Sequence, residues 1–212
     1  MQTKYDIILV AGGHAGCEAA HAAARMGSKV LLLTMNMETI AKMSCNPAMG
    51  GVAKGQIIRE IDALGGMSGI ITDRSMIQFR MLNKSKGPAM WSPRAQSDRQ
   101  LFSQYWREAL EKNPNVQFFQ DTAVSLGLDN NNHIQSVKTA LGFEFYARSV
   151  ILTSGTFLNG LIHIGRKQMG GGRMAESKST GITETLESFG FISGRMKTGT
   201  PPRVDGRSLD YN

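Results

Sequence analysis

A glycine-rich turn near the start of the chain has the residue types that bind phosphate groups. Dinucleotide-binding folds place the pattern G-x-G-x-x-G between their first strand and first helix, whose free N–H groups then face the pyrophosphate. This chain has Ala11-Gly12-Gly13-His14-Ala15-Gly16, so the first glycine of the pattern is replaced by Ala11 and the other two are present. The turn predicts a dinucleotide site; the alternative is a packing turn that binds no ligand.

Two features of this turn depart from the usual pattern. If position 11 needs a positive φ, an alanine there costs about 1 kcal/mol or more. An acidic residue about 20 positions after the glycines normally holds the ribose hydroxyls. The candidates here are Asn36 and Glu38, and a role as surface loop residues is at least as well supported for each.

The second group with chemical potential surrounds Cys45. Asn46 and Pro47 follow it, then Gly50 and Gly51, and a predicted helix begins soon after. A thiol before a helix N-terminus has reason to ionise and to act as a nucleophile. The alternative is a small buried hydrophobic residue, which is the common role of a lone cysteine. Cys17 lies among alanines inside a predicted helix, and we expect it in the core.

A basic segment forms the third group. Its cations surround Trp91, and basic residues with an exposed aromatic ring suit single-stranded nucleic acid. The alternative is an ordinary solvated surface with Trp91 in the core. The histidines have no metal-ligand spacing with each other or with the cysteines, so we predict no metal site. The cations of this segment are Arg80, Lys84, Lys86, Arg94 and Arg99.

The elements that would position these residues follow from the hydrophobic pattern. A buried strand over 5–10, a helix over 14–26 and a second buried strand over 29–34 form a βαβ unit around the glycine turn. Residues 83–94 are expected to be a loop. We further predict helices over 52–64, 95–112 and 179–189, a strand over 76–82, a β-meander of strands over 116–119, 123–128, 133–140 and 143–146, and a return strand over 150–153.

Composition narrows the class of protein. The chain has 212 residues, 41% of them hydrophobic, which is enough for one domain or somewhat more. The net charge of +7 favours an anionic partner such as RNA or a phosphate-bearing cofactor. No apolar run approaches the ~20 residues of a membrane helix. With only two cysteines and no signal-peptide pattern at the start, we expect a cytoplasmic protein and no membrane partner.

Several strings in the chain are longer than generic motifs. Together and in this order, they resemble the MnmG (GidA) family of tRNA uridine 5-carboxymethylaminomethyl modification enzymes, and the resemblance covers essentially the whole chain. The family has glycine where this chain has Ala11. The strings are residues 12–20 (GGHAGCEAA), 44–48 (SCNPA), 59–66 (REIDALGG), 85–89 (SKGPA), 155–160 (GTFLNG) and 197–203 (KTGTPPR).

The resemblance implies an α/β fold, an FAD-binding Rossmann-like parallel sheet of the glutathione-reductase type with a β-meander. It implies FAD contacts from residues 11–16, from the backbone near Ala123 and from Ser179, and a catalytic role for Cys45. We add Lys84, Lys86 and Arg94 as candidate tRNA contacts. The implied parts are a βαβ unit over 5–34, a helical and loop insertion over 44–112, a meander over 116–146, a return strand and second glycine loop over 150–189, and a transition over 197–212.

The implied activity uses FAD, NADH and methylenetetrahydrofolate to add a carboxymethylaminomethyl or aminomethyl group to C5 of the tRNA wobble uridine. The implied partners are tRNA, a GTPase of the MnmE family and a second copy in a homodimer. Family members are much longer than this chain, so we expect it to be an N-terminal part whose FAD domain is incomplete. The alternative is a truncated fragment that binds FAD or tRNA and catalyses nothing alone.

Overall fold

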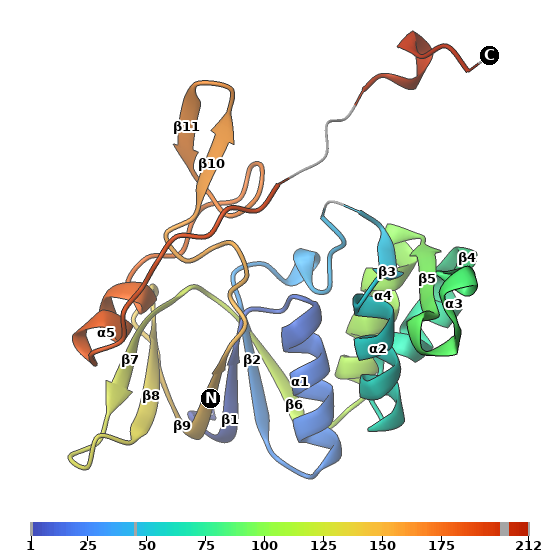
Figure 1. Cartoon of the computed structure of the whole chain (residues 1–212). Helices are drawn as coiled ribbons and strands as arrows, with labels where there is room; N and C mark the ends of the chain where they lie inside the picture. The colour runs from blue at the N-terminus through green and yellow to red at the C-terminus, as the bar shows by residue number, and fades with distance from the viewer. Residues whose placement is uncertain (1, 45, 200–203, 212) are drawn as a thin grey trace.

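The computed structural model describes residues 2–44, 46–199 and 204–211. Its centre is a six-stranded sheet in the order β6-β2-β1-β9-β8-β7, in which β6, β2, β1 and β9 are parallel and β8 and β7 continue antiparallel (Figure 1). The strands are β1 (Lys4–Val10), β2 (Val30–Thr34), β6 (Val116–Gln120), β7 (Ala123–Leu128), β8 (Ile134–Thr139) and β9 (Glu144–Leu152).

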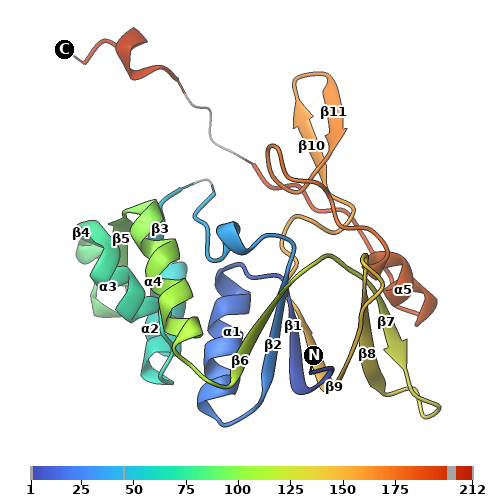
Figure 2. The same cartoon turned by 180° about the vertical axis from the view of Figure 1, so that it is seen from behind.

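Both faces of the parallel part are covered, which explains its continuous apolar strands. Every residue of β2 is buried, and its side chains alternate between two core clusters. On one face α1 (His14–Arg25) and α4 (Arg99–Glu111) supply Cys17, Phe102 and Trp106. The other cluster joins the meander to α5 (Ile182–Ser188) through Phe145 and Ile182. Figure 2 shows from behind that α5 lies beside β7.

A smaller antiparallel sheet lies beside α1 and α4, in the order β3-β5-β4 (Figure 1). Helices α2 and α3 pack with it, and the tip of its β4–β5 hairpin holds two short 3-10 helices. A separate two-stranded hairpin, β10–β11, projects from the main body. These elements are β3 (Ala48–Gly50), α2 (Lys54–Ala63), α3 (Ser68–Ser75), β4 (Met76–Leu82), η2 (Lys84–Lys86), η3 (Pro88–Met90), β5 (Ser92–Ser97), β10 (Leu161–Ile164) and β11 (Lys167–Gly170). Two further 3-10 turns are η1 (Met37–Thr39) and η4 (Gly206–Ser208).

The predicted βαβ unit and the α/β fold class are confirmed, but several elements differ from the prediction. The strand over 116–119 was placed in the meander, whereas β6 pairs with β2 in the parallel sheet. The strands over 143–146 and 150–153 are one strand, β9, whose residues 144–146 pair with β8 and whose residues 146–152 pair with β1. The meander is therefore β7-β8-β9.

Two helix starts and one predicted loop also differ. Residues 95–97 belong to β5, because the Asp98 side chain accepts bonds from two backbone N–H groups and begins α4 there. Helix α5 begins after Gly181, with Glu184 bonded back to the Gly181 N–H, rather than at 179. The expected loop over 83–94 is the tip and return strand of the β4–β5 hairpin. Along the described ranges, no helix is both long and apolar enough to cross a membrane.

Candidate dinucleotide site

The glycine turn lies at the carboxyl edge of the parallel sheet, where β1 passes into α1 (Figure 1). The Ala11 N–H donates to the Leu33 carbonyl over 2.8 Å at the end of β2. From the end of β9, the Thr153 hydroxyl lies 2.9 Å from the Val10 carbonyl and 2.8 Å from the Ala11 carbonyl. The ends of three parallel strands therefore meet at this turn, the position where open α/β sheets bind ligands.

The two glycines kept from the pattern have different surroundings. A Cβ added at Gly16 would lie 2.0 Å from the Ala11 carbonyl oxygen, so only glycine lets α1 approach the strand this closely. A Cβ at Gly13 would have nothing within 4 Å. Gly13 is the N-cap of α1 and offers no capping side chain, so the space in front of the first helical N–H groups stays open.

Ala11 has a φ of 82°, a left-handed conformation that favours glycine. The sequence raised the question whether position 11, where the family has glycine, needs a positive φ. The structure shows that this position does have a positive φ. Bonds on both sides of the residue, to Leu33 and Thr153, hold it there.

His14 is the first residue of α1, and its ring makes contacts inside the protein. Its Nε2 lies 3.2 Å from the Ala41 carbonyl, and its ring centroid is 5.3 Å from that of Phe102. Burial lowers the pKa of His14, and the positive charge of Lys54 lowers it further. The bond to the Ala41 carbonyl raises the pKa, and Arg173 lowers it by the smallest of these effects. The imidazole is thus neutral at neutral pH, and positive charge already surrounds the helix start.

The two cations that act on His14 come from separate segments. Lys54 begins α2, and although the residue is exposed, partial desolvation of its amine lowers its pKa. Arg173 follows the second glycine loop, pairs with Glu176 at 3.2 Å and lies over the Phe157 ring at 5.5 Å. A field of this sign suits a phosphate-bearing ligand.

Ser154 lies two residues after the end of β9, at the same edge, and has an unsatisfied hydroxyl. The residue is only 9% exposed, and its Oγ has no hydrogen-bond partner within the part of the chain that the structure describes. Since a buried hydroxyl without a partner is costly, a polar ligand at this edge would satisfy it. Sequence reasoning missed Thr153, Ser154 and Arg173; the run Thr153-Ser154-Gly155 after the return strand was the available signal.

The structure brings two other predicted contacts together. The Ser179 hydroxyl donates to the Ala123 carbonyl over 3.3 Å, and the Ser179 N–H donates to Phe157 over 2.8 Å. Both residues are buried, and Ala123 shares a core cluster with Val10 and Leu33, the last apolar residues of β1 and β2. They therefore lie near the edge that carries the turn.

Asn36 and Glu38, the two candidate ribose ligands, already have a hydrogen-bond or ion-pair partner in the protein. Asn36 accepts from the Glu38 N–H over 2.8 Å and so caps η1. The Glu38 carboxylate forms an ion pair with Arg107 at 3.2 Å on the surface. Nothing in this geometry favours either side chain as a ribose ligand.

Of the two cysteines, Cys17 is among the described residues and Cys45 is not. Cys17 is fully buried, its Sγ lies 3.4 Å from the Gly12 carbonyl, and burial raises its thiol pKa to about 12, which confirms the prediction that it is a core residue. Cys45 lies outside the described residues. The segment after it is anchored, because the Pro47 carbonyl accepts from the Ser97 N–H over 2.7 Å.

The candidate tRNA contacts lie on the β4–β5 hairpin, away from the glycine turn in sequence. Lys84 and Lys86 are in η2 at the tip, and Arg94 is in β5. Trp91 is 40% exposed, and its indole N–H donates to the Lys84 carbonyl over 3.1 Å. Trp91 is therefore not a core residue.

A parallel sheet whose first strand enters a helix through this glycine turn defines a Rossmann-like, dinucleotide-binding class of α/β protein. The comparisons agree and are more specific. The chain belongs to the GIDA family, glucose inhibited division protein A, whose sequence model matches residues 6–212.

Among curated relatives, the chain is 68% identical over 212 residues to "tRNA uridine 5-carboxymethylaminomethyl modification enzyme MnmG" of Cytophaga hutchinsonii. It is 65% identical over 209 residues to the protein of the same name from Flavobacterium johnsoniae. The match covers all of this chain but 34% of the Cytophaga protein, so the chain spans about a third of the length of such relatives.

Among solved structures, the chain is similar to GidA of Aquifex aeolicus, with a TM-score of 0.93 and 46% identity over 99% of this chain and 35% of that one. A GidA-related protein from Thermus thermophilus, 22% identical with a TM-score of 0.64, shares the fold. The predicted fold class, an FAD-binding Rossmann-like sheet with a meander, is confirmed by this likeness.

Proposed function

We propose that the protein supplies the FAD-binding part of an enzyme that modifies C5 of the wobble uridine in tRNA. The observation that carries this proposal is the 68% identity, over the whole chain, to a relative whose name states that it modifies tRNA uridine. The family motifs of the sequence support the same function.

The residues at the carboxyl edge fit FAD. The N–H groups at the start of α1 would hold the pyrophosphate in the open space at Gly13, where a Cβ would intrude. The unpartnered Ser154 hydroxyl would gain an acceptor or donor, and Lys54 and Arg173 would lower the cost of the phosphate charge. Ala123 and Ser179 would contribute at the same edge. When bound, FAD would supply redox chemistry, with NADH as the reductant.

The remaining features of the proposal extend beyond the cofactor. Methylenetetrahydrofolate would provide the carbon unit, Cys45 would act as a catalytic thiolate, and Lys84, Lys86 and Arg94 would contact tRNA. The active protein would be a cytoplasmic homodimer that works with a GTPase of the MnmE family. The resemblance of the sequence strings supports these points.

The test replaces the matching third of the Cytophaga relative with these 212 residues. The chimera is incubated with FAD, NADH, methylenetetrahydrofolate, glycine or ammonium as the nitrogen donor, the GTPase with GTP, and unmodified tRNA, and the digested nucleosides are analysed. We expect the modified uridine from the chimera and from a Cys17→Ala control, and none from Cys45→Ser although FAD stays bound. A chimera that binds FAD and yields no modified uridine contradicts the proposed function.

Two further outcomes have separate meanings. Full activity of the Cys45→Ser chimera would remove Cys45 from catalysis and leave the rest of the proposal standing. The chimera also distinguishes the alternative, a fragment that binds FAD or tRNA without catalysis, because that alternative expects bound ligand and no product even when the rest of the enzyme is supplied.

A further inference from the structure

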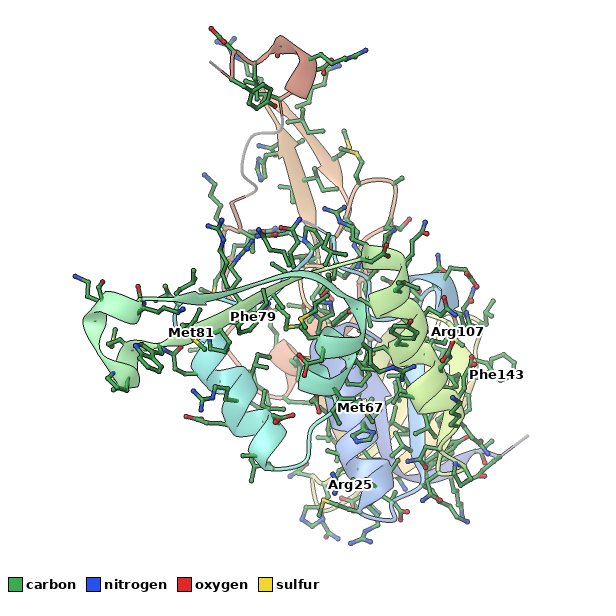
Figure 3. All side chains as sticks on the ribbon, turned by 90° about the vertical axis from the view of Figure 1, so that its right-hand side faces the viewer. Arg25, Met67, Phe79, Met81, Arg107 and Phe143 are labelled. Carbon is green, nitrogen blue, oxygen red and sulfur yellow. The ribbon has the colours of Figure 1, made fainter. Side chains whose placement is uncertain are left out.

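The small sheet β3-β5-β4 has a core-facing side and a polar side. Its register aligns Met49 with Ala95 and Ala95 with Phe79, so these three side chains share one face. Met49 and Ala95 are buried, and Met49 belongs to the core cluster that Ile58 of α2 packs against. In Figure 3 the labelled Phe79 and Met81 lie on the side of the hairpin toward α2. The residues between them in sequence therefore point to the opposite side.

This opposite side, the polar face, consists of Gln78, Arg80, Arg94 and Gln96. Gln78 pairs with Gln96, and Arg80 pairs directly with Arg94 across the two strands. On its other side Arg94 is next to Gly50 of β3, which has no side chain. Arg80 is exposed and Arg94 is half-buried.

Among the residues that the structure describes, no acidic side chain pairs with either arginine. Strands β3, β4 and β5 contain no aspartate or glutamate. Within residues 2–44, 46–199 and 204–211, neither guanidinium makes a hydrogen bond or an ion pair. Like charges directly opposite each other on a sheet face destabilise it, since their Cβ atoms are about 4.5–5.5 Å apart. An anion between the two guanidinium groups would remove this repulsion and accept paired N–H bonds from each.

The rest of the hairpin indicates which anion. Nearer the tip, the next pair on this face is Leu82 and Ser92, and Ser92 is buried and bonded to Gln56 of α2. At the tip itself, Lys84 and Lys86 add charge and Trp91 is partly exposed. Glutamine amides both donate and accept, as base edges require, and guanidinium planes stack on unpaired bases. Single-stranded RNA has phosphates at regular intervals with bases between them. This pattern matches the arginine pair and the glutamine pair of the polar face better than an acidic protein surface does.

We propose that the polar face binds single-stranded RNA, with Arg80 and Arg94 together holding the backbone phosphates and Gln78 and Gln96 facing the bases. The proposal rests on the proposed function, for which the unpaired anticodon loop of tRNA is the natural ligand. It adds a surface, with Arg80 at its centre, on an element that does not include the glycine turn.

The test measures binding of a fluorescein-labelled, unmodified tRNA anticodon stem-loop to the 212-residue chain by fluorescence anisotropy at several salt concentrations. We expect the double variant Arg80→Gln, Arg94→Gln to raise Kd about tenfold or more. The slope of log Kd against log salt should fall by about 1.4, since each single-strand phosphate contact contributes about 0.7. Its thermal midpoint should stay equal or rise, because the repulsion is removed.

A matched control removes the same charge elsewhere. Lys138 and Arg148 are exposed on the large sheet, and the variant Lys138→Gln, Arg148→Gln should change Kd by less than about twofold. A second variant separates binding from folding: Arg94→Glu places an acid opposite Arg80, so we expect a higher thermal midpoint together with loss of RNA binding.

The proposal is overturned if the wild-type chain does not bind the stem-loop, or if the double variant keeps the wild-type Kd and salt slope. The second result would assign the pair to an ordinary surface or to an acidic protein partner. FAD binding and nucleoside analysis are measured in separate experiments. If the chain binds RNA through these residues but the chimera forms no modified uridine, the result contradicts only the proposed function.

Discussion

Ala11 adopts a left-handed backbone conformation that favours glycine over alanine. It holds a φ of 82° in the turn that begins α1, where an L-residue other than glycine pays about 1–2 kcal/mol. The strand ends on either side fix it, through Leu33 and Thr153, so the turn cannot relax without losing those bonds. The strain is therefore present with or without a ligand.

We predict that Ala11→Gly raises the free energy of unfolding by up to about 1 kcal/mol, because relief of strain exceeds the entropy cost of glycine. Urea denaturation of the chain without ligand measures it. The control is Ala23→Gly inside α1, where glycine should destabilise by about 1 kcal/mol. A destabilised Ala11→Gly protein would show that the turn tolerates the methyl group without strain.

Among the elements, α3 shows how a helix is fixed by a distant residue. Glu18 on α1 accepts from the Met67 N–H over 2.7 Å and the Ser68 N–H over 2.9 Å, and it also bonds the Ser68 hydroxyl. These groups start α3, which has no capping side chain of its own. A carboxylate at a helix N-terminus also interacts favourably with the helix dipole.

Replacing Glu18 with alanine leaves these N–H groups without their acceptor. We predict that Glu18→Ala lowers the free energy of unfolding by about 1–3 kcal/mol. Hydrogen exchange should show the loss of protection first in α3. Glu60→Ala, an exposed glutamate on α2, is the matched control and should change stability by less than about 0.5 kcal/mol. Equal effects of the two substitutions would contradict the capping role.

The elements that the sequence predicted well are those whose signals are local. The βαβ unit was predictable because buried strands, a glycine turn and an alanine-rich helix follow one another within a short span. Helix α3 was not, because its start depends on Glu18, about 50 positions earlier in the sequence. The β5–α4 boundary was missed because residues 95–97 satisfy a helical period as well as a strand, and the capping bonds of Asp98 decide between them.

The residues of the candidate site also divide into those with a local sequence signal and those that depend on distant parts of the chain. Gly13 and Gly16 belong to a motif and could be placed from the sequence. Ser154 and Arg173 reach the site through the return of β9 and through the second glycine loop. The run Thr153-Ser154-Gly155 is the one local signal for Ser154, and Arg173 has no local pattern that indicates a ligand. Cys45 rests on sequence reasoning alone.

At the scale of the whole molecule, the ends of β1, β2 and β9 converge where α1 begins, and cations from two other segments act on the same helix start. The small sheet presents its arginine pair on a different element. The central claim is that the converging edge binds FAD at the open space beside Gly13.

Titration of FAD into the 212-residue chain, followed by flavin fluorescence, tests this claim most directly. We compare wild type with Gly13→Ala, whose Cβ meets no atom within 4 Å and should leave folding intact, and with the control Gly194→Ala, which is equally unobstructed. The account predicts saturable binding to wild type and control with equal thermal midpoints throughout, and an affinity about tenfold or more weaker for Gly13→Ala, because the methyl group occupies the pyrophosphate space. Absence of FAD binding to the wild type, or equal affinity of all three proteins, would contradict it.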